Sequence, residues 1–209
     1  MKSLLRRVDD VLRGRAASQP WLLVVLCGMA YGAVMGSFAG RAWQVAYSAA
    51  KVPLLLLATL TLSLPSYFIL NTLLGVRAEF ARALRAIVSS QAALTIILVA
   101  LAPLTTLWYA SSANYQAAIL FNGLMFATAS LGAQVVLARA YRPLVARDPK
   151  HRALLRIWLF LYAFVGIQMG WILRPFIGSA LAPLRFFRGG DWENAYVVVA
   201  RLVWKTLTR

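Results

Sequence analysis

The sequence predicts an all-α fold, a polytopic transmembrane helical bundle with about five spans and additional interfacial amphipathic helices. Of its 209 residues, 61% are hydrophobic and 13% are charged, whereas an ordinary globular domain is about half apolar and about a quarter charged. The apolar residues gather in stretches of about 20, the length that a helix needs to cross a ~30 Å hydrocarbon layer. We therefore expect one compact bundle embedded in a membrane.

The apolar stretches divide the chain into three parts. Spans are expected at about residues 21–40, 52–74, 91–109, 117–138 and 157–173, within a transmembrane bundle of residues 16–178. Residues 1–15 carry leucine and valine at helical spacing between charged residues, which is typical of an amphipathic helix on the cytoplasmic membrane surface. Two further interfacial helices are expected over residues 76–88 and 192–207, the second within an interfacial C-terminal tail of residues 179–209.

The distribution of basic residues predicts the orientation of the chain. Five Lys and Arg precede the first span, three lie between the second and third, and six between the fourth and fifth. The opposite side has two in the first connection and none in the third, but six after the fifth span, namely Arg174 and five in the tail. Because cytoplasmic loops are enriched in Lys and Arg, we expect a cytoplasmic N-terminus and a location in a bacterial inner membrane. If the tail is also cytoplasmic, one span must be re-entrant, and the third, which Pro103 interrupts, is the first candidate.

Composition also bears on cofactors and catalysis. Because every cluster of Lys and Arg adjoins a predicted span, we interpret the formal charge of +16 as topology signals and contacts with anionic lipid headgroups, not nucleic-acid binding. The single histidine, His151, lies beside Lys150 and Arg152 and is expected to be solvated, and the single cysteine, Cys27, falls in the first span. These two residues cannot assemble a zinc, haem or iron–sulfur site. With no catalytic motif and no acidic residue within a span, we expect no cofactor, no metal and no enzymatic activity.

Glycines recur on one face of the first span. Gly28, Gly32, Gly36 and Gly40 are four residues apart, and this spacing opens a groove that another backbone can approach closely. The groove serves either packing within the chain or an interface with a partner subunit or a second copy. Gly166 and Gly170 form a second such pair in the fifth span and are expected to pack against the first.

The exit of the fifth span is rich in aromatic and basic residues. Trp171, Arg174 and Phe176 suit an interfacial belt in which the arginine reaches lipid headgroups. Phe186, Phe187 and Trp192 follow, and aromatic residues and arginine are favoured at protein interfaces. This segment is interpreted either as an anchored helix end or as a docking edge.

Three amide side chains are candidates for a polar path through the bundle. Asn71, Asn122 and Gln168 fall within predicted spans, where polar residues often line a solute route. All six acidic residues lie outside the spans, which argues against a transporter coupled to protons or cations. The simpler interpretation is that the amides form hydrogen bonds between helices.

The last quarter of the chain resembles a known family. The resemblance rests on the runs Phe164-Val165-Gly166-Ile167-Gln168-Met169-Gly170 and Leu173-Arg174-Pro175-Phe176-Ile177-Gly178. These runs resemble an uncharacterised family of bacterial multi-pass membrane proteins, some of which are labelled actin-binding WH2 proteins. The tetrad Leu5-Arg6-Arg7-Val8 is similar to a basic WH2 core, but too few residues precede it for the usual helix, so we infer no actin binding. The five-span plan is also similar in topology to Yip1-type membrane proteins, and neither resemblance implies catalytic residues.

Together these features favour a non-catalytic integral membrane subunit or scaffold of a larger complex. Its expected partners are other integral membrane subunits, or a second copy in a homo-oligomer, together with membrane lipids. Two alternatives are a channel or transporter for a neutral or anionic solute, and a Yip1-like protein that organises membranes.

Overall fold

The regular elements in the described part of the chain are helices. The computed structural model describes residues 2–13, 19–178, 186–187 and 197. Their elements, in order, are α1 (Lys2–Leu12), α2 (Pro20–Gly36), η1 (Ser37–Ala39), α3 (Ala42–Leu73), η2 (Arg77–Glu79), α4 (Phe80–Ser111), α5 (Tyr115–Arg147) and α6 (Lys150–Ile172). Five helices within these residues are long and apolar enough to cross a membrane. The prediction of an all-α, multi-pass membrane bundle is confirmed.

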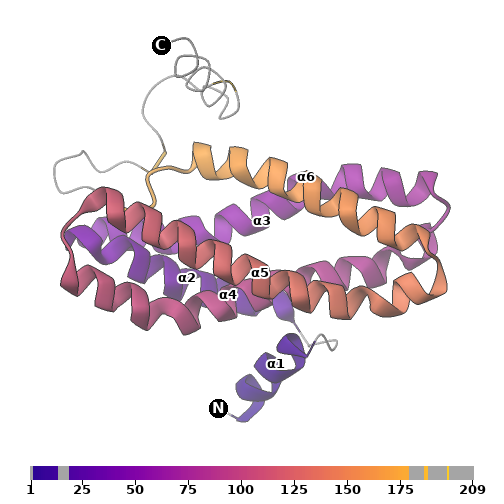
Figure 1. Cartoon of the computed structure of the whole chain (residues 1–209), viewed down its shortest axis with the longest axis horizontal. Helices are drawn as coiled ribbons and strands as arrows, with labels where there is room; N and C mark the ends of the chain where they lie inside the picture. The colour runs from indigo at the N-terminus through magenta and orange to yellow at the C-terminus, as the bar shows by residue number, and fades with distance from the viewer. Residues whose placement is uncertain (1, 14–18, 179–185, 188–196, 198–209) are drawn as a thin grey trace.

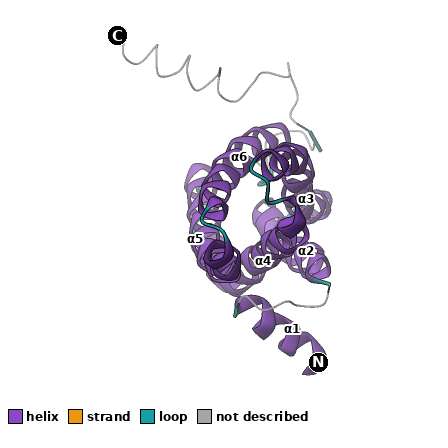
Figure 2. Cartoon of the chain, turned by 90° about the vertical axis from the view of Figure 1, so that its right-hand side faces the viewer, coloured by secondary structure: helices purple, strands orange, loops and turns teal. Residues whose placement is uncertain are grey.

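The five long helices run side by side along the long axis of the molecule (Figure 1). Viewed along that axis they form a ring in the order α6, α3, α2, α4, α5, with α1 outside it against α4 (Figure 2). Consecutive helices are antiparallel, so the α2–α3 and α4–α5 connections share one end, here called the Gly40 end. The α3–α4 and α5–α6 connections share the other, here called the Glu79 end.

Four helices are longer than their predicted spans, and α3, α4 and α5 exceed them most. α3 and α4 have 32 residues each and α5 has 33, which at 1.5 Å per residue is roughly 48 Å and exceeds a ~30 Å hydrocarbon layer. The separate interfacial helix expected over residues 76–88 is not found, because from Phe80 those residues form the first part of α4. The chain there changes from amphipathic to apolar without a glycine or proline to interrupt the helix.

Two hydrophobic clusters fill the bundle, one in each half of its length. The cluster of the Gly40 half joins α2 to parts of α3, α4 and α5 and includes Tyr31, Leu98 and Ala129. The cluster of the Glu79 half joins α3, α4, α5 and the start of α6, and includes Tyr67 and Trp158. The buried residues of α6 are His151, Leu154 and Trp158, all in its first half. The packing between α5 and α6 therefore loosens toward the Gly40 end.

Glycines set the distance between α2 and α3. A Cβ atom at Gly32 would lie 2.3 Å from the Ser48 carbonyl oxygen, and one at Gly36 would lie 2.7 Å from that of Gln44. The backbone of α3 thus fills the predicted glycine groove, which places this interface within the chain. Gly28 belongs to the same contact, with its Cβ position 3.4 Å from Pro53, whereas Gly40 adopts a φ of +66° at the end of η1 and faces open space.

The second glycine pair has different neighbours. Gly166 faces the Thr59 side chain of α3, with 3.5 Å between the Cβ position and Cγ2, and nothing lies within 4 Å of the Cβ position at Gly170. The neighbour of the α2 glycines is therefore α3, not the Gly166–Gly170 segment expected from the sequence.

Candidate functional site

One face of α3 carries buried polar side chains along its whole length. They are at most 1% exposed and are Gln44, Ser48, Lys51, Thr59, Ser63, Tyr67 and Asn71. This set is called the polar face of α3. Burying such groups costs free energy unless they are hydrogen-bonded, so their partners indicate which parts of the bundle they hold together.

At the Glu79 end the polar face joins α3 to α5. The Tyr67 hydroxyl is hydrogen-bonded to the Tyr141 hydroxyl, and the Asn71 side-chain amide donates to the Tyr67 carbonyl oxygen over 2.8 Å. The Tyr67 ring also lies edge-on to Trp158 of α6, with 4.9 Å between ring centroids. Three helices therefore meet around one tyrosine.

His151 is buried, contrary to the expectation that it is solvated. Its side chain has no exposed surface, and its Nε2 lies 2.5 Å from a carboxylate oxygen of Glu79. Because α6 begins at Lys150, the histidine shares an inward face with Leu154 and Trp158, three and seven residues later. That spacing is visible in the sequence. The charged neighbours Lys150 and Arg152 favoured the prediction of a solvated histidine, but their own side chains are exposed while the histidine points inward.

Glu79 also contacts two arginines. Its carboxylate lies 3.3 Å from Arg147 at the end of α5 and 3.9 Å from Arg82 in α4. With His151 from α6, this one carboxylate joins three helices at the Glu79 end.

The middle of the polar face is less completely paired. The Thr59 hydroxyl donates to the Leu55 carbonyl oxygen over 2.7 Å, and the Tyr162 hydroxyl of α6 donates to the Gln91 side chain of α4 over 2.8 Å. Ser63 Oγ, in this middle part, is buried without a hydrogen-bond partner among the described residues, as are Asn71 Oδ1 and His151 Nδ1 at the Glu79 end. Such atoms are uncommon in native structures and call for an explanation.

At the Gly40 end the polar face holds the segment after α6, residues 174–177, here called the strap. Lys51 donates to the Pro175 carbonyl oxygen over 2.6 Å, and Gln44 donates to that of Phe176 over 3.0 Å, joined there by the Ser48 hydroxyl. Backbone carbonyl groups that are partly buried outside a helix need hydrogen-bond donors from elsewhere in the protein. The side chains of Lys51, Gln44 and Ser48 donate these hydrogen bonds.

The strap has further support from α5 and from a glycine. The Tyr115 hydroxyl of α5 donates to the Ile177 carbonyl oxygen over 3.1 Å. A Cβ atom at Gly178 would lie 2.6 Å from the Gln44 side chain, so only a glycine allows this approach. The run that carries the family resemblance thus folds back onto the bundle.

Lys51 lies within a long helix, not in a connection between spans. The sequence placed Lys51 in the first connection, but α3 begins at Ala42 and Lys51 is fully buried within it. The residues from Ala42 to Lys51 contain no helix breaker, so the helix starts well before the apolar run. The helical spacing of Gln44, Ser48 and Lys51 was the signal that could have revealed this buried face.

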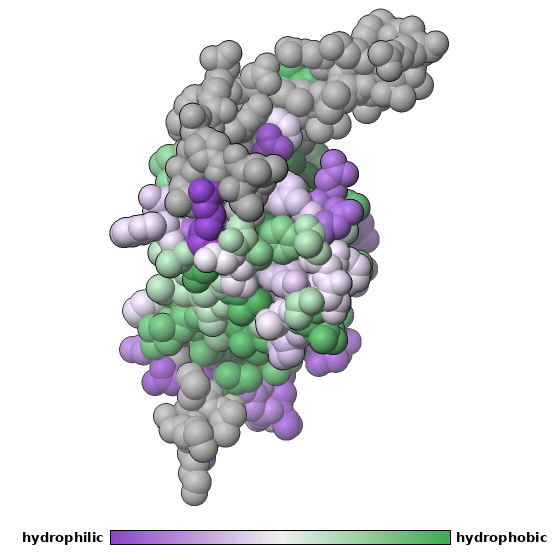
Figure 3. Space-filling model, turned by 90° about the vertical axis from the view of Figure 1, so that its left-hand side faces the viewer, coloured by the Kyte–Doolittle hydropathy of each residue, from purple (hydrophilic) through white to green (hydrophobic). Residues whose placement is uncertain are grey.

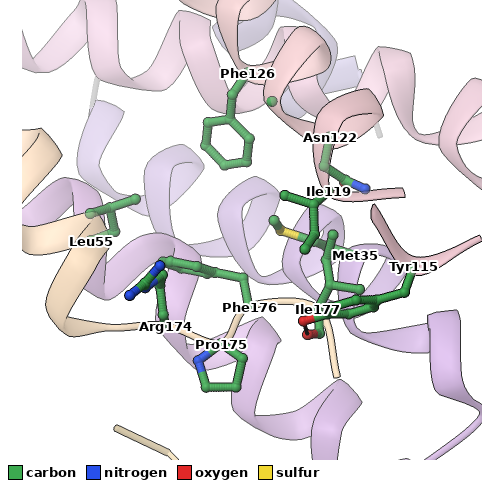
Figure 4. Close-up of a pocket in the computed structure, with 11 residues that line it drawn as sticks. Met35, Leu55, Tyr115, Ile119, Asn122, Phe126, Arg174, Pro175, Phe176 and Ile177 are labelled. Carbon is green, nitrogen blue, oxygen red and sulfur yellow. Dashed lines mark hydrogen bonds between the residues drawn. The ribbon is translucent and has the colours of Figure 1, made fainter. Parts of the chain in front are cut away.

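A cavity of about 540 Å³ lies between the strap and the helices of the Gly40 half (Figure 4). Its lining comes from α2, α3, α5 and the strap: Met35, Leu55, Tyr115, Ile119, Asn122, Gly123, Phe126, Arg174, Pro175, Phe176 and Ile177. Figure 3 shows this end of the bundle, with hydrophobic residues in the middle of the face and hydrophilic residues mainly near its edges. This cavity is called the strap pocket.

Asn122 forms the polar part of the inner wall of the pocket. Its amide nitrogen donates to the Tyr109 hydroxyl over 2.7 Å and to the Ala118 carbonyl oxygen over 2.8 Å. Its oxygen accepts from the Tyr31 hydroxyl over 3.1 Å. The amide therefore joins α2, α4 and α5, as expected for a hydrogen bond between helices.

The other predicted residues are dispersed. Asn71 lies in the Glu79 half and Gln168 is half-buried on α6, so of the three amides Asn122 alone lines the strap pocket. The Arg174 guanidinium stacks on Trp171, with 3.4 Å to the ring centroid.

Two of the three aromatic residues singled out in the tail, Phe186 and Phe187, are among the residues that the structure describes. Phe186 lies edge-on to Tyr47 and within 5.2 Å of the Lys51 ammonium, and Phe187 packs edge-on to Phe186. Trp192 is outside the described residues.

Within the described ranges, no three His, Cys, Asp or Glu side chains gather closely enough to hold a metal ion. Comparison with known protein families, with curated proteins and with solved structures finds no match to this chain. The polar face, the strap and the strap pocket are therefore the features that bear on function.

Proposed function

We propose that this chain is a non-catalytic membrane subunit or scaffold of a larger complex in the bacterial inner membrane. The observation that carries the proposal is the poor coverage of α6. In its most apolar segment 11% of the residues are buried, against 28% to 50% in the other four candidate spans. Phe160, Phe164 and Ile167 are 75%, 48% and 57% exposed, so this helix offers a surface to a partner helix.

The accessible backbone of α6 at Gly170 supports the same proposal. Helices in membranes associate through close packing at small residues, because lipid removes most of the hydrophobic driving force. The open space around Gly170 leaves the backbone of α6 accessible to another helix. The buried ionisable groups, Lys51 and His151, have structural partners in the strap and in Glu79, which agrees with a non-catalytic role.

The arrangement of charge supports a cytoplasmic N-terminus. The Glu79 end gathers nine exposed basic residues on the described helices: Arg77, Arg82, Arg85, Arg139, Arg142, Arg147, Lys150, Arg152 and Arg156. The described residues of the Gly40 half carry Arg41, Lys51 and Arg174. The positive-inside rule favours the Glu79 end in the cytoplasm. Because α2 then crosses toward the Gly40 end, α1 and the start of α2, which precede this crossing, are on the cytoplasmic side as well.

The test is purification of the tagged chain in mild detergent, followed by mass spectrometry of what stays bound. We expect a stoichiometric integral membrane partner that is lost when Gly170→Trp blocks close approach to α6. Leu120→Trp is the matched control, because Leu120 is 75% exposed on α5, away from that face. A wild-type chain that is solitary, or a partner retained equally by both variants, contradicts the proposal.

Transport of a neutral or anionic solute is the second candidate, and the polar face of α3 favours it. Ser63 and Asn71 of this face each have a buried polar atom without a hydrogen-bond partner in the described structure, as does His151 of α6. Polar and ionisable residues within spans commonly mark solute paths. Solute flux into proteoliposomes should fall when Ser63→Leu closes this face, with the exposed Ser66→Leu as control; flux that is absent, or equal in both variants, opposes this candidate.

A further inference from the structure

The strap pocket is open toward the surroundings of the bundle. Ile119, which lines it, is 45% exposed, and Gly123 is also exposed on α5. Beyond Trp158, no residue of α6 up to Ile172 is buried, so α6 does not close the pocket from its side. In a membrane-spanning bundle, the surroundings of this opening are lipid.

The size of the pocket excludes a transmembrane helix as its occupant. A helix is about 10 Å across, so a cavity of about 540 Å³ would hold only about 7 Å of its length. That is little more than one turn. A hydrocarbon chain is much thinner, and pockets of roughly 300–1,000 Å³ typically hold small ligands.

The lining favours a ligand that is apolar over most of its length. Leu55, Phe126 and Phe176 surround the cavity in Figure 4, together with Met35 and Ile119. The polar atoms of Asn122 are already engaged with Tyr31, Tyr109 and Ala118, and the Tyr115 hydroxyl donates to the strap. A polar solute would therefore find few hydrogen-bond partners within the pocket.

The one charged group among the described lining residues is a cation. Arg174 follows the end of α6 at Ile172, where a span leaves the hydrocarbon layer, and stacks on Trp171. Tryptophan and arginine at a span end are typical of the headgroup level, and the planar guanidinium is suited to phosphate. The pocket thus combines an apolar interior with a cation at headgroup depth.

We propose that the strap pocket binds an acyl chain of an anionic phospholipid whose phosphate contacts Arg174. The lipid fills the space that α6 leaves open and lies against the strap that Lys51 and Tyr115 hold in place. This site goes beyond a scaffold role, because it is specific for a lipid class and does not require a protein partner.

The test uses the full chain, purified alone and reconstituted in phosphatidylcholine vesicles. Trace phosphatidylglycerol or phosphatidylcholine with a photoactivatable group on the acyl chain is added, and labelled residues are mapped by mass spectrometry. We expect the phosphatidylglycerol probe to label Leu55, Ile119 and Phe126 in preference to the phosphatidylcholine probe. Arg174→Gln should lower that preference about fivefold, the factor for about 1 kcal/mol from one basic residue near an anionic headgroup.

A second part of the experiment fills the strap pocket with a larger side chain. Gly123→Leu should abolish labelling of Phe126, since nothing lies within 4 Å of the Cβ position of Gly123 and the new side chain has room to occupy the cavity. Ile119→Phe serves the same purpose if the first variant does not fold, and Ala127→Leu, one turn further along α5 on an exposed position, is the matched control.

Equal labelling by the two lipids in the wild-type chain overturns the proposal, as does labelling of Phe126 that the folded filling variants leave unchanged. Because the chain is reconstituted without partners, either result leaves the subunit proposal to its own test.

Discussion

The Lys51 ammonium nitrogen lies 2.6 Å from the carbonyl oxygen of Pro175, which joins the interior of α3 to the strap after α6. The next carbonyl, of Phe176, accepts from Gln44 and Ser48, and the one after it from Tyr115. Successive carbonyl groups of a non-helical segment thus each receive a side-chain donor. The lysine therefore fixes the strap, which in turn forms one wall of the strap pocket.

Replacing Lys51 should destabilise the protein. Lys51→Met keeps much of the length of the side chain but leaves a partly buried carbonyl without its donor, a loss of about 1–3 kcal/mol. Thermal unfolding in detergent measures it. Lys150→Met is the control, because Lys150 donates to the Leu74 carbonyl oxygen at an exposed site, where changes are usually within about 0.5 kcal/mol. Equal unfolding temperatures for the two variants would show that the strap does not depend on Lys51.

Adding a single methyl group at Gly32 should also destabilise the bundle. Alanine is favoured over glycine in a helix by about 1 kcal/mol, but this Cβ would lie 2.3 Å from the Ser48 carbonyl oxygen and 2.9 Å from the Ala49 Cα. Backbone atoms cannot move aside as a flexible side chain can, and overpacking typically costs about 1–3 kcal/mol.

Gly170→Ala is the matched control for Gly32→Ala, since its Cβ position has nothing within 4 Å. We expect Gly32→Ala to lower the unfolding temperature and Gly170→Ala to leave it unchanged or raise it. A stabilised Gly32→Ala variant would mean that α2 and α3 pack less closely than the structure indicates.

The sequence was sufficient for features that depend on neighbouring residues. Hydropathy located five spans, and a four-residue repeat located the glycine face at Gly28, Gly32 and Gly36. It was insufficient where burial depends on several helices together. His151 lies among charged residues in sequence but on the inward face of α6, and Lys51 precedes the apolar run but belongs to the polar face of α3. The strap pocket depends on the path of the chain after Pro175, which no local pattern predicts.

The histidine at the Glu79 end should contribute to stability through its burial. His151→Ala removes a ring that fills the space beside Tyr141 and deprives Glu79 of its closest partner. We expect a loss of about 2–4 kcal/mol, measured by denaturant unfolding in detergent. Glu79→Gln should cost less, because an amide retains hydrogen-bonding capacity toward the histidine.

Arg152→Ala is the control for the histidine variant, since it changes an exposed neighbour on the same turn of α6. If His151→Ala and Arg152→Ala unfold alike, the histidine is solvated in the native protein and its contact with Glu79 is incidental.

The orientation of the bundle can be tested with cysteines at its two ends. With Cys27 replaced by serine, Ala113→Cys places a thiol in the α4–α5 connection at the Gly40 end, and Ala146→Cys places one near the end of α5 at the Glu79 end; both positions are exposed. Because the basic residues gather at the Glu79 end, we expect a membrane-impermeant maleimide to label Ala113→Cys from the periplasmic side. Ala146→Cys should react only in inverted vesicles, where the cytoplasmic side is accessible.

Reversed labelling would place the N-terminus in the periplasm and show that the basic C-terminal tail determines the topology. Labelling of both cysteines from one side would mean that α5 does not cross the membrane, although its 33 residues are long enough to do so.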